Sequence, residues 1–291
     1  MESKTIKIFG SPGTGKTTTL LKLLEEKIAE GYKPEKIGFF SFTRRAIREA
    51  RGRVIKKFNL SEDELEYFRT IHSLCYRTLN INSGQVFKGE RVKEFSEIAR
   101  VEMSGVSEED TSGLSVGNKK GDLLLFCDEG DLKEVWKELE CEHTWEEQEY
   151  FSKALMNFKK SKNLLDFTDM LDVFIKEEII PQLDIIFVDE AQDLTTKQWK
   201  VIERINEYCK FRYIAGDDDQ AIYRWAGADV KRFLNIKGNI KVLPISYRLP
   251  KTIHKLACDI SHKISLRQSK KWTSKEDQGS ITDIYSIEDV D

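Results

Sequence analysis

Two short segments of the chain carry residue types suited to chemistry on a phosphorylated substrate. Residues 10–17 read GSPGTGKT, and residues 185–193 read IIFVDEAQD. The first is a glycine-rich turn that follows an apolar run at Ile6–Phe9 and opens a stretch with helical spacing at Thr17–Ala29. Backbone N–H groups in such a turn point at an anion, and the helix dipole adds to the attraction. The second is an apolar strand that ends in adjacent carboxylates.

Together the two segments predict a site that binds a nucleoside triphosphate with magnesium and hydrolyses it. Lys16 would reach the β- and γ-phosphates, while the Thr17 hydroxyl and Asp189 would hold the magnesium ion. Glu190 would orient and deprotonate the attacking water. The residues expected to surround the nucleotide phosphates are Gly10, Ser11, Gly13, Thr14, Gly15, Lys16, Thr17 and Thr18. Taken alone, the first segment could be a turn that binds nothing, and the second could be a solvated strand end.

Composition limits the classes of partner. The 291 residues carry a net charge of −3, so the chain is not a globally basic nucleic-acid binder. Basic residues dominate from Lys33 to Lys57 and acidic ones from Glu102 to Glu149, which favours a local groove for any polyanion. The five cysteines contain no CxxC pair and suggest reduced thiols in the cytoplasm. We find no signal peptide and no apolar run that spans a membrane, so no membrane partner is expected.

Strand-like and helical segments alternate along the chain. The strand-like runs are Ile6–Phe9, Ile37–Phe42, Ile185–Asp189, Phe211–Ala215 and Ile240–Leu243. This alternation predicts an α/β fold with a parallel sheet, with the nucleotide at the carboxyl ends of its strands. Residues 1–79 and 161–240 would form the nucleotide-binding lobe, and residues 80–160 a small helical insertion. Residues 241–291 would begin a second unit, with a helix from Pro250 to Lys263 and a possible strand at Ile281–Ile287.

Four further motifs follow in one order along the chain. They are FTRRA at Phe42–Ala46, RTIHS at Arg69–Ser73, AGDDDQAIYRWAGA at Ala215–Ala228 and ISYR at Ile245–Arg248. With the two nucleotide motifs, this series resembles the superfamily 1 helicases of the UvrD/Rep/PcrA type over residues 5–265, apart from the insertion. The resemblance implies a P-loop NTPase with a RecA-like lobe, and a second lobe of which the chain holds the beginning.

The same resemblance implies roles for further residues. Gln220 would sense the γ-phosphate, Arg248 would reach it from the lobe interface, and Tyr247 would stack on the nucleotide base. The residues implied to line a single-strand groove are Phe42, Thr43, Arg44, Thr70, His72, Tyr223 and Trp225. Aromatic side chains beside a basic groove bind single strands regardless of sequence. Some have a structural alternative: Phe42 or Trp225 could be core, His72 a satisfied structural histidine, and Arg44 a solvated helix residue.

The function implied is an ATP- and Mg²⁺-dependent translocase or helicase that moves 3′ to 5′ on single-stranded DNA or at a junction with duplex. Because an arginine finger contributes about 10³–10⁵ in rate, and that of the second lobe lies outside these residues, the chain alone is expected to hydrolyse ATP weakly. Two rival interpretations stay open, namely a non-motor regulatory module that binds nucleotide and DNA, and a P-loop kinase. The acidic insertion could contact a protein partner.

Overall fold

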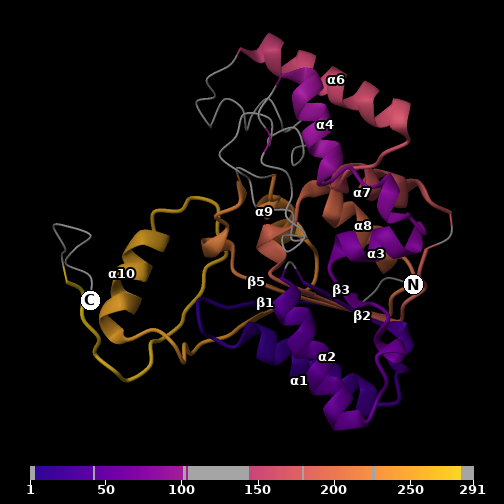
Figure 1. Ribbon diagram of the computed structural model, residues 1–291. Helices are drawn as coiled ribbons and strands as arrows, with labels where there is room; N and C mark the ends of the chain where they lie inside the picture. The colour runs from indigo at the N-terminus through magenta and orange to yellow at the C-terminus, as the bar shows by residue number, and fades with distance from the viewer. Residues whose placement is uncertain are drawn as a thin grey trace.

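A six-stranded parallel sheet organises the molecule (Figure 1). The computed structural model describes residues 4–41, 43–100, 103, 144–178, 180–224 and 227–282. The strands lie in the order β3-β2-β4-β5-β1-β6, and every neighbouring pair is parallel. Their bounds are β1 Lys4–Phe9, β2 Ile37–Ser41, β3 Phe68–Arg69, β4 Ile185–Asp189, β5 Phe211–Gly216 and β6 Asn239–Val242. The α/β fold class predicted from the alternating pattern is confirmed.

Helices cover both faces of the sheet (Figure 1). Helices α1 (Lys16–Ala29) and α2 (Arg44–Phe58) lie on one face. The other face carries α3 (Ile71–Thr78), α7 (Phe167–Lys176), α8 (Thr196–Asn206) and α9 (Val230–Asn235). Since β4 is buried along its whole length, its alternate side chains enter two separate apolar clusters, one under each layer of helices. Short 3₁₀ turns occupy Pro34–Lys36, Asp63–Leu65, Ser83–Gln85, Ala191–Asp193 and Asp218–Gln220.

A row of aromatic rings crosses the face that α1 and α2 cover. Phe187 on β4 stacks on Tyr213 of β5 at 4.9 Å between ring centroids and on Phe39 of β2 at 6.2 Å. Phe39 in turn stacks on Phe68 of β3 at 5.9 Å. The parallel register that pairs these positions brings the rings into line. The row ties four strands together and holds their carboxyl ends level, where the motifs begin.

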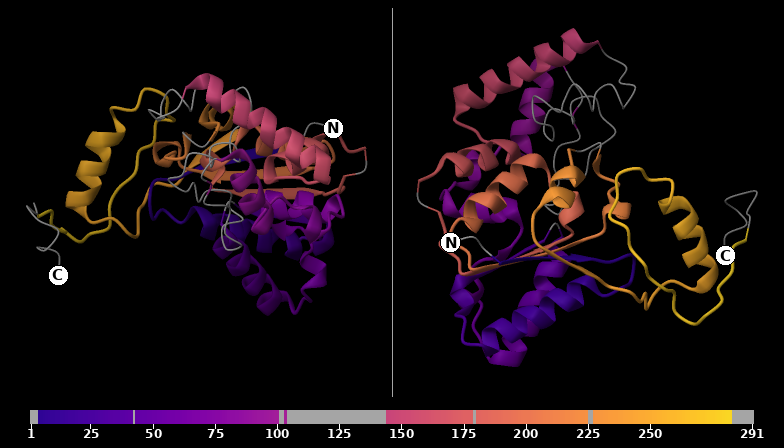
Figure 2. Two further views of the ribbon diagram at one scale, coloured as in Figure 1. Left: turned by 45° about the horizontal axis from the view of Figure 1, so that its top comes forward. Right: turned by 180° about the vertical axis from the view of Figure 1, so that it is seen from behind.

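Two helices from the predicted insertion pack against each other beside α7, as the two views of Figure 2 show. These are α4 (Glu90–Ala99) and α6 (Trp145–Lys162), which bury a small apolar cluster of their own. Lys159 at the end of α6 binds Asp166 at 2.5 Å and Asp169 at 2.6 Å, and Asp166 is the N-cap of α7. Most of the acidic stretch lies outside the described residues, and the division into domains stays a prediction.

Helix α10 (Lys251–Ser261) lies beyond β6, away from the layered part of the molecule (Figures 1 and 2). The predicted helix from Pro250 to Lys263 is this element. The possible strand at Ile281–Ile287 falls mostly outside the described residues, and Ile281 itself is not in a strand. In the described part of the chain, no helix combines the length and the apolar character needed to cross a bilayer.

We expect Phe187→Ala to lower the free energy of unfolding by about 3–5 kcal/mol, because it removes a fully buried ring from the middle of the row. Urea unfolding followed by circular dichroism measures the change. Tyr208→Ala is the control, because Tyr208 is 44% exposed and its loss should cost less than about 0.5 kcal/mol. Equal losses in the two variants would contradict a role for the row.

Candidate nucleotide-binding and hydrolysis site

The phosphate loop leaves β1 at Phe9 and enters α1 at Lys16. Gly13 and Gly15 have φ values of 73° and 83°, a backbone conformation that glycine adopts without strain. The Thr14 hydroxyl donates to the Ser11 carbonyl at 2.8 Å, and the Lys16 ammonium donates to the Gly10 carbonyl at the same distance. The loop is therefore a closed turn with its lysine folded over it, and no side chain that the structure describes caps the N-terminus of α1. Thr18 is exposed on the first turn of that helix.

Thr17 and Asp189 meet although 172 positions separate them. The Thr17 hydroxyl donates to Asp189 Oδ2 at 2.7 Å, and the backbone N–H of Glu190 donates to Oδ1 at 3.1 Å. Burial and the neighbouring Glu190 carboxylate raise the pKa of Asp189 to about 6. One hydroxyl beside one buried carboxylate fits Mg²⁺, which keeps several waters and takes few protein ligands when substrate phosphates supply the others. The residues predicted for magnesium are brought together here.

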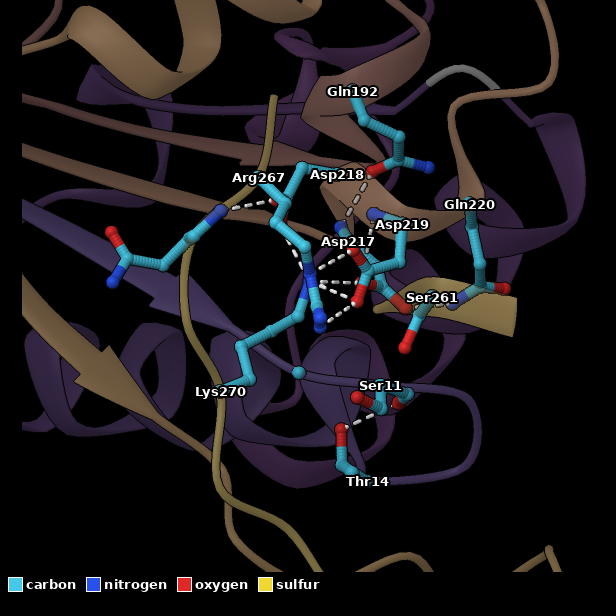
Figure 3. A network of polar contacts seen from close by, with 12 residues as sticks. Ser11, Thr14, Gln192, Asp217, Asp218, Asp219, Gln220, Ser261, Arg267 and Lys270 are labelled. Carbon is cyan, nitrogen blue, oxygen red and sulfur yellow. Dashed lines mark hydrogen bonds and ion pairs between the residues drawn. The ribbon is translucent and has the colours of Figure 1, made fainter. Parts of the chain in front are cut away.

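Gln192 links the acidic loop after β4 to the loop after β5, as Figure 3 shows for its carbonyl oxygen. Its amide nitrogen donates to Glu190 Oε2 at 3.1 Å and to Asp193 Oδ2 at 3.0 Å. Its oxygen accepts from the backbone N–H of Asp217 at 2.9 Å. Glu190, in the left-handed region at φ 51°, is half-buried and turned into this network. Sequence reasoning missed Gln192, although it lies two residues after the predicted general base.

The loop after β5 holds the predicted phosphate sensor. The Gln220 side-chain amide donates to Asp217 Oδ2, and Asp217 is fully buried. A continuous path of hydrogen bonds therefore runs from Glu190 through Gln192 and Asp217 to Gln220. This path connects the residue predicted to activate water with the residue predicted to sense the phosphate.

The segment after β6 contacts the phosphate loop through its backbone and one hydroxyl. Ser246 Oγ donates to the Pro12 carbonyl at 2.7 Å, and the Tyr247 N–H donates to the Gly13 carbonyl at 2.9 Å. A Cβ on Gly13 would lie 2.3 Å from Cβ of Arg248. The Tyr247 side chain is 75% exposed, and Arg248 is exposed. Both predicted residues thus adjoin the loop, and Ser246, which no sequence argument singled out, anchors them.

The residues predicted to contact DNA have mixed positions. Thr43 and Thr70 follow the adjacent strands β2 and β3, and each caps a helix by accepting from a backbone N–H at 3.3 Å. Arg44 is exposed on the first turn of α2, and Tyr223 is half-buried. Phe42 and Trp225 lie outside the described residues. The two threonines therefore act as N-caps of α2 and α3, and their contact with DNA stays a prediction.

His72 packs against Phe167, the first residue of α7. Its ring lies edge-on to Phe167, with 5.5 Å between the ring centroids. Desolvation lowers the pKa of His72 to about 4. The imidazole is therefore neutral at physiological pH and can contact a phosphate or base only as a neutral group.

Comparison with known proteins assigns the family. The sequence model of the UvrD/REP helicase N-terminal domain matches residues 1–241. The chain belongs to this family. The phosphate loop, the acidic loop after β4 and the loop after β5, called the GDDDQ loop for its residues Gly216–Gln220, all lie within the matched residues. This UvrD/REP domain therefore includes each part of the site except the segment after β6.

Individual relatives agree with this assignment. The ATP-dependent DNA helicase PcrA of Staphylococcus aureus (strain Mu50 / ATCC 700699) is 27% identical to this chain. The matched region makes up 92% of the chain and 39% of that helicase. PcrA of Bacillus subtilis (strain 168) is 26% identical over 96% of the chain, covering 40% of that protein. The helicase Rep of Buchnera aphidicola subsp. Baizongia pistaciae is 26% identical over 96%, covering 44%. The chain spans less than half the length of these relatives.

We expect Gly13→Ala to weaken binding of Mg²⁺-ATP by about tenfold or more, equivalent to about 1.4 kcal/mol. The added methyl group would meet Cβ of Arg248 and push the segment after β6 off the phosphate loop. Isothermal titration calorimetry measures the affinity. Gly31→Ala is the matched control, because Gly31 also has positive φ, at 96°, but a Cβ there meets no atom within 4 Å. An equal loss of affinity in both variants would show that backbone strain alone is responsible.

We expect Asp193→Asn to stabilise the protein at pH 8 and not at pH 4. Burial and Glu190 raise the pKa of Asp193 from 3.8 to about 7, so its ionisation increasingly destabilises the folded state across that interval. One carboxylate oxygen is buried without a hydrogen-bond partner, while asparagine keeps an oxygen for Gln192. Thermal unfolding in EDTA without nucleotide, from pH 4 to 8, measures the difference. Asp63→Asn, at an exposed position, controls for the lost charge. If the stability difference between Asp193→Asn and the unaltered protein did not change with pH, the raised pKa of Asp193 would be contradicted.

Proposed function

We propose that the chain is the nucleotide-binding part of an ATP-dependent DNA helicase or translocase that moves on single-stranded DNA, 3′ to 5′ by resemblance. The observation that carries the proposal is the path of hydrogen bonds Glu190–Gln192–Asp217–Gln220. A motor must connect hydrolysis to its grip on DNA, and this path joins the acidic loop to the loop that continues into Ile222–Ala228. The names of the relatives, which are ATP-dependent DNA helicases, support the same conclusion.

The residues of the site divide the work of phosphoryl transfer to water. Lys16 and the N-terminus of α1 bind the phosphates, which requires Lys16 to leave the Gly10 carbonyl. Thr17 and Asp189 hold Mg²⁺, which when bound neutralises charge on the transferring phosphoryl group. Glu190, oriented by Gln192, accepts the proton of the attacking water. Gln220 contacts the terminal phosphate and passes its loss to the loop that follows.

Nucleotide and DNA would lie on the same side of the molecule. The phosphate loop, the acidic loop, the GDDDQ loop, Thr43 and Thr70 all follow the carboxyl ends of parallel strands. The exposed Arg44 on the first turn of α2 supplies positive charge on that side. We place this activity in the cytoplasm, because the free thiols of Cys75, Cys209 and Cys258 suit a reducing compartment.

We expect Glu190→Gln to keep its affinity for Mg²⁺-ATP and to hydrolyse it about 10²–10⁴-fold more slowly, because it removes the general base and retains the shape. Single-turnover hydrolysis with excess protein, with and without a single-stranded oligonucleotide, measures the rate. Glu207→Gln, an exposed carboxylate after α8, is the control and should hydrolyse at the rate of the unaltered protein.

The oligonucleotide separates the proposal from its rivals. Hydrolysis that oligonucleotide accelerates supports a motor. Oligonucleotide binding without any effect on hydrolysis supports a regulatory module that binds nucleotide and DNA. If the oligonucleotide still accelerates hydrolysis in Gln220→Ala, the role of the hydrogen-bond path is contradicted. That result would favour the rival interpretation, a P-loop phosphotransferase.

A further inference from the structure

A buried lysine from the segment after α10 lies in the centre of the GDDDQ loop (Figure 3). The ammonium of Lys270 is 2.7 Å from Asp217 Oδ1, 2.6 Å from Asp218 Oδ1 and 3.0 Å from Asp219 Oδ2. Its side chain has no exposed surface. Lys270 lies beyond residues 1–241, the part matched by the helicase family.

Neighbouring groups complete the environment of the three carboxylates. Arg267 holds Asp219 through two parallel hydrogen bonds of 2.9 and 2.8 Å, and the backbone N–H of Gln268 donates to Asp218 Oδ2 at 2.6 Å. Burial alone would lower the pKa of Lys270, but Asp217 and Asp218 outweigh it, so the net pKa is raised. The ammonium therefore stays charged. Three adjacent carboxylates at this depth repel one another, and these cations allow them to share one loop.

Asp217 connects this cluster to the predicted phosphate sensor. Its Oδ1 forms an ion pair with the ammonium of Lys270, and its Oδ2 accepts a hydrogen bond from the side-chain amide of Gln220. Oδ1 also accepts from the backbone N–H of Asp219, at 3.3 Å. Lys270 is the charged one of the two described partners of Oδ1 and the closer of them, at 2.7 Å, so its loss would leave only the longer, neutral hydrogen bond to hold that side of the carboxylate.

We propose that Lys270 is a positioning residue for ATP hydrolysis: it fixes the carboxylate of Asp217, and through it the side chain of Gln220. The inference rests on the proposed function, because it concerns the residue that contacts the terminal phosphate. It also assigns to the segment after α10 a direct part in the geometry of a site formed otherwise by residues before it. The alternative is that Lys270 only balances charge, in which case its loss would reduce stability without a specific effect on Gln220.

The chain contains a matched control for that alternative. Lys159 is also a lysine between two aspartates, Asp166 and Asp169, with only 13% of its side chain exposed. It joins α6 to α7 and has no contact with the GDDDQ loop among the described residues. Lys270→Met and Lys159→Met remove the same group from similar surroundings. Asp218→Asn combined with Lys270→Met lowers the excess negative charge and provides a second, compensated variant if Lys270→Met does not fold.

The first readout is the side-chain amide resonance of Gln220 in the full chain without nucleotide. It is assigned by its absence in Gln220→Ala. We expect the amide shifts to move to those of a free glutamine in Lys270→Met or the compensated variant, to return in Lys270→Arg, and to stay unchanged in Lys159→Met. An unchanged Gln220 resonance in the variants without the lysine would overturn the proposal.

The second readout is single-turnover ATP hydrolysis. Misplacement of a group by about 1 Å can cost about 10²-fold in rate, so Lys270→Met should be slowed by that order with little change in nucleotide affinity. The double variant Lys270→Met/Gln220→Ala should hydrolyse ATP no more slowly than Gln220→Ala alone, because Lys270 acts only through Gln220. Multiplied effects would contradict the proposal. Absence of both Mg²⁺-ATP binding and hydrolysis in the unaltered chain would refute the proposed function, while the resonance of Gln220 would still decide the role of Lys270.

Discussion

Crowding of negative charge at one edge of the sheet is the constraint on which the site depends. Parallel strands end at the same edge, so the loops after β4 and β5 bring six carboxylates together. They are Asp189, Glu190, Asp193, Asp217, Asp218 and Asp219. A site for Mg²⁺ and a general base needs some of them ionised, while burial makes each ionisation costly. The raised pKa values of Asp189 and Asp193 show that cost. In the GDDDQ loop, Lys270 and Arg267 supply cations that pair with the carboxylates.

Two glutamines connect these carboxylates without adding charge. An amide donates through its nitrogen and accepts through its oxygen, so Gln192 can bind the acidic loop on one side and the Asp217 N–H on the other. A lysine in place of Gln192 would form an ion pair with Glu190, the proposed base, and a further acid there would add to the repulsion. Gln220 binds Asp217 in the same neutral way. These hydrogen bonds fix the positions of the carboxylates, while Lys270 and Arg267 balance their charge.

The fold and the core of the site could be predicted from the sequence because they depend on local patterns. Apolar runs of four to six residues predicted five of the six strands, and the parallel arrangement brings Thr17 and Asp189 to the same edge of the sheet. Strand β3 was missed, since the two residues Phe68–Arg69 are too short for any periodicity. Lys270 and Arg267 were missed because they lie in a polar stretch about fifty positions after their partners, where basic residues are usually solvated. Only the path of the chain in space reveals such pairs.

The chain after β6 contacts the site in two places, at the phosphate loop and at the GDDDQ loop, and the two sets of contacts differ in strength. The contacts with the phosphate loop, Ser246 with Pro12 and Tyr247 with Gly13, are neutral hydrogen bonds that contribute about 0.5–1.5 kcal/mol each. Withdrawal of Lys270 would leave buried carboxylates without a cation, which costs about 3–5 kcal/mol. The segment after α10 is therefore held to the GDDDQ loop more strongly than the segment after β6 is held to the phosphate loop.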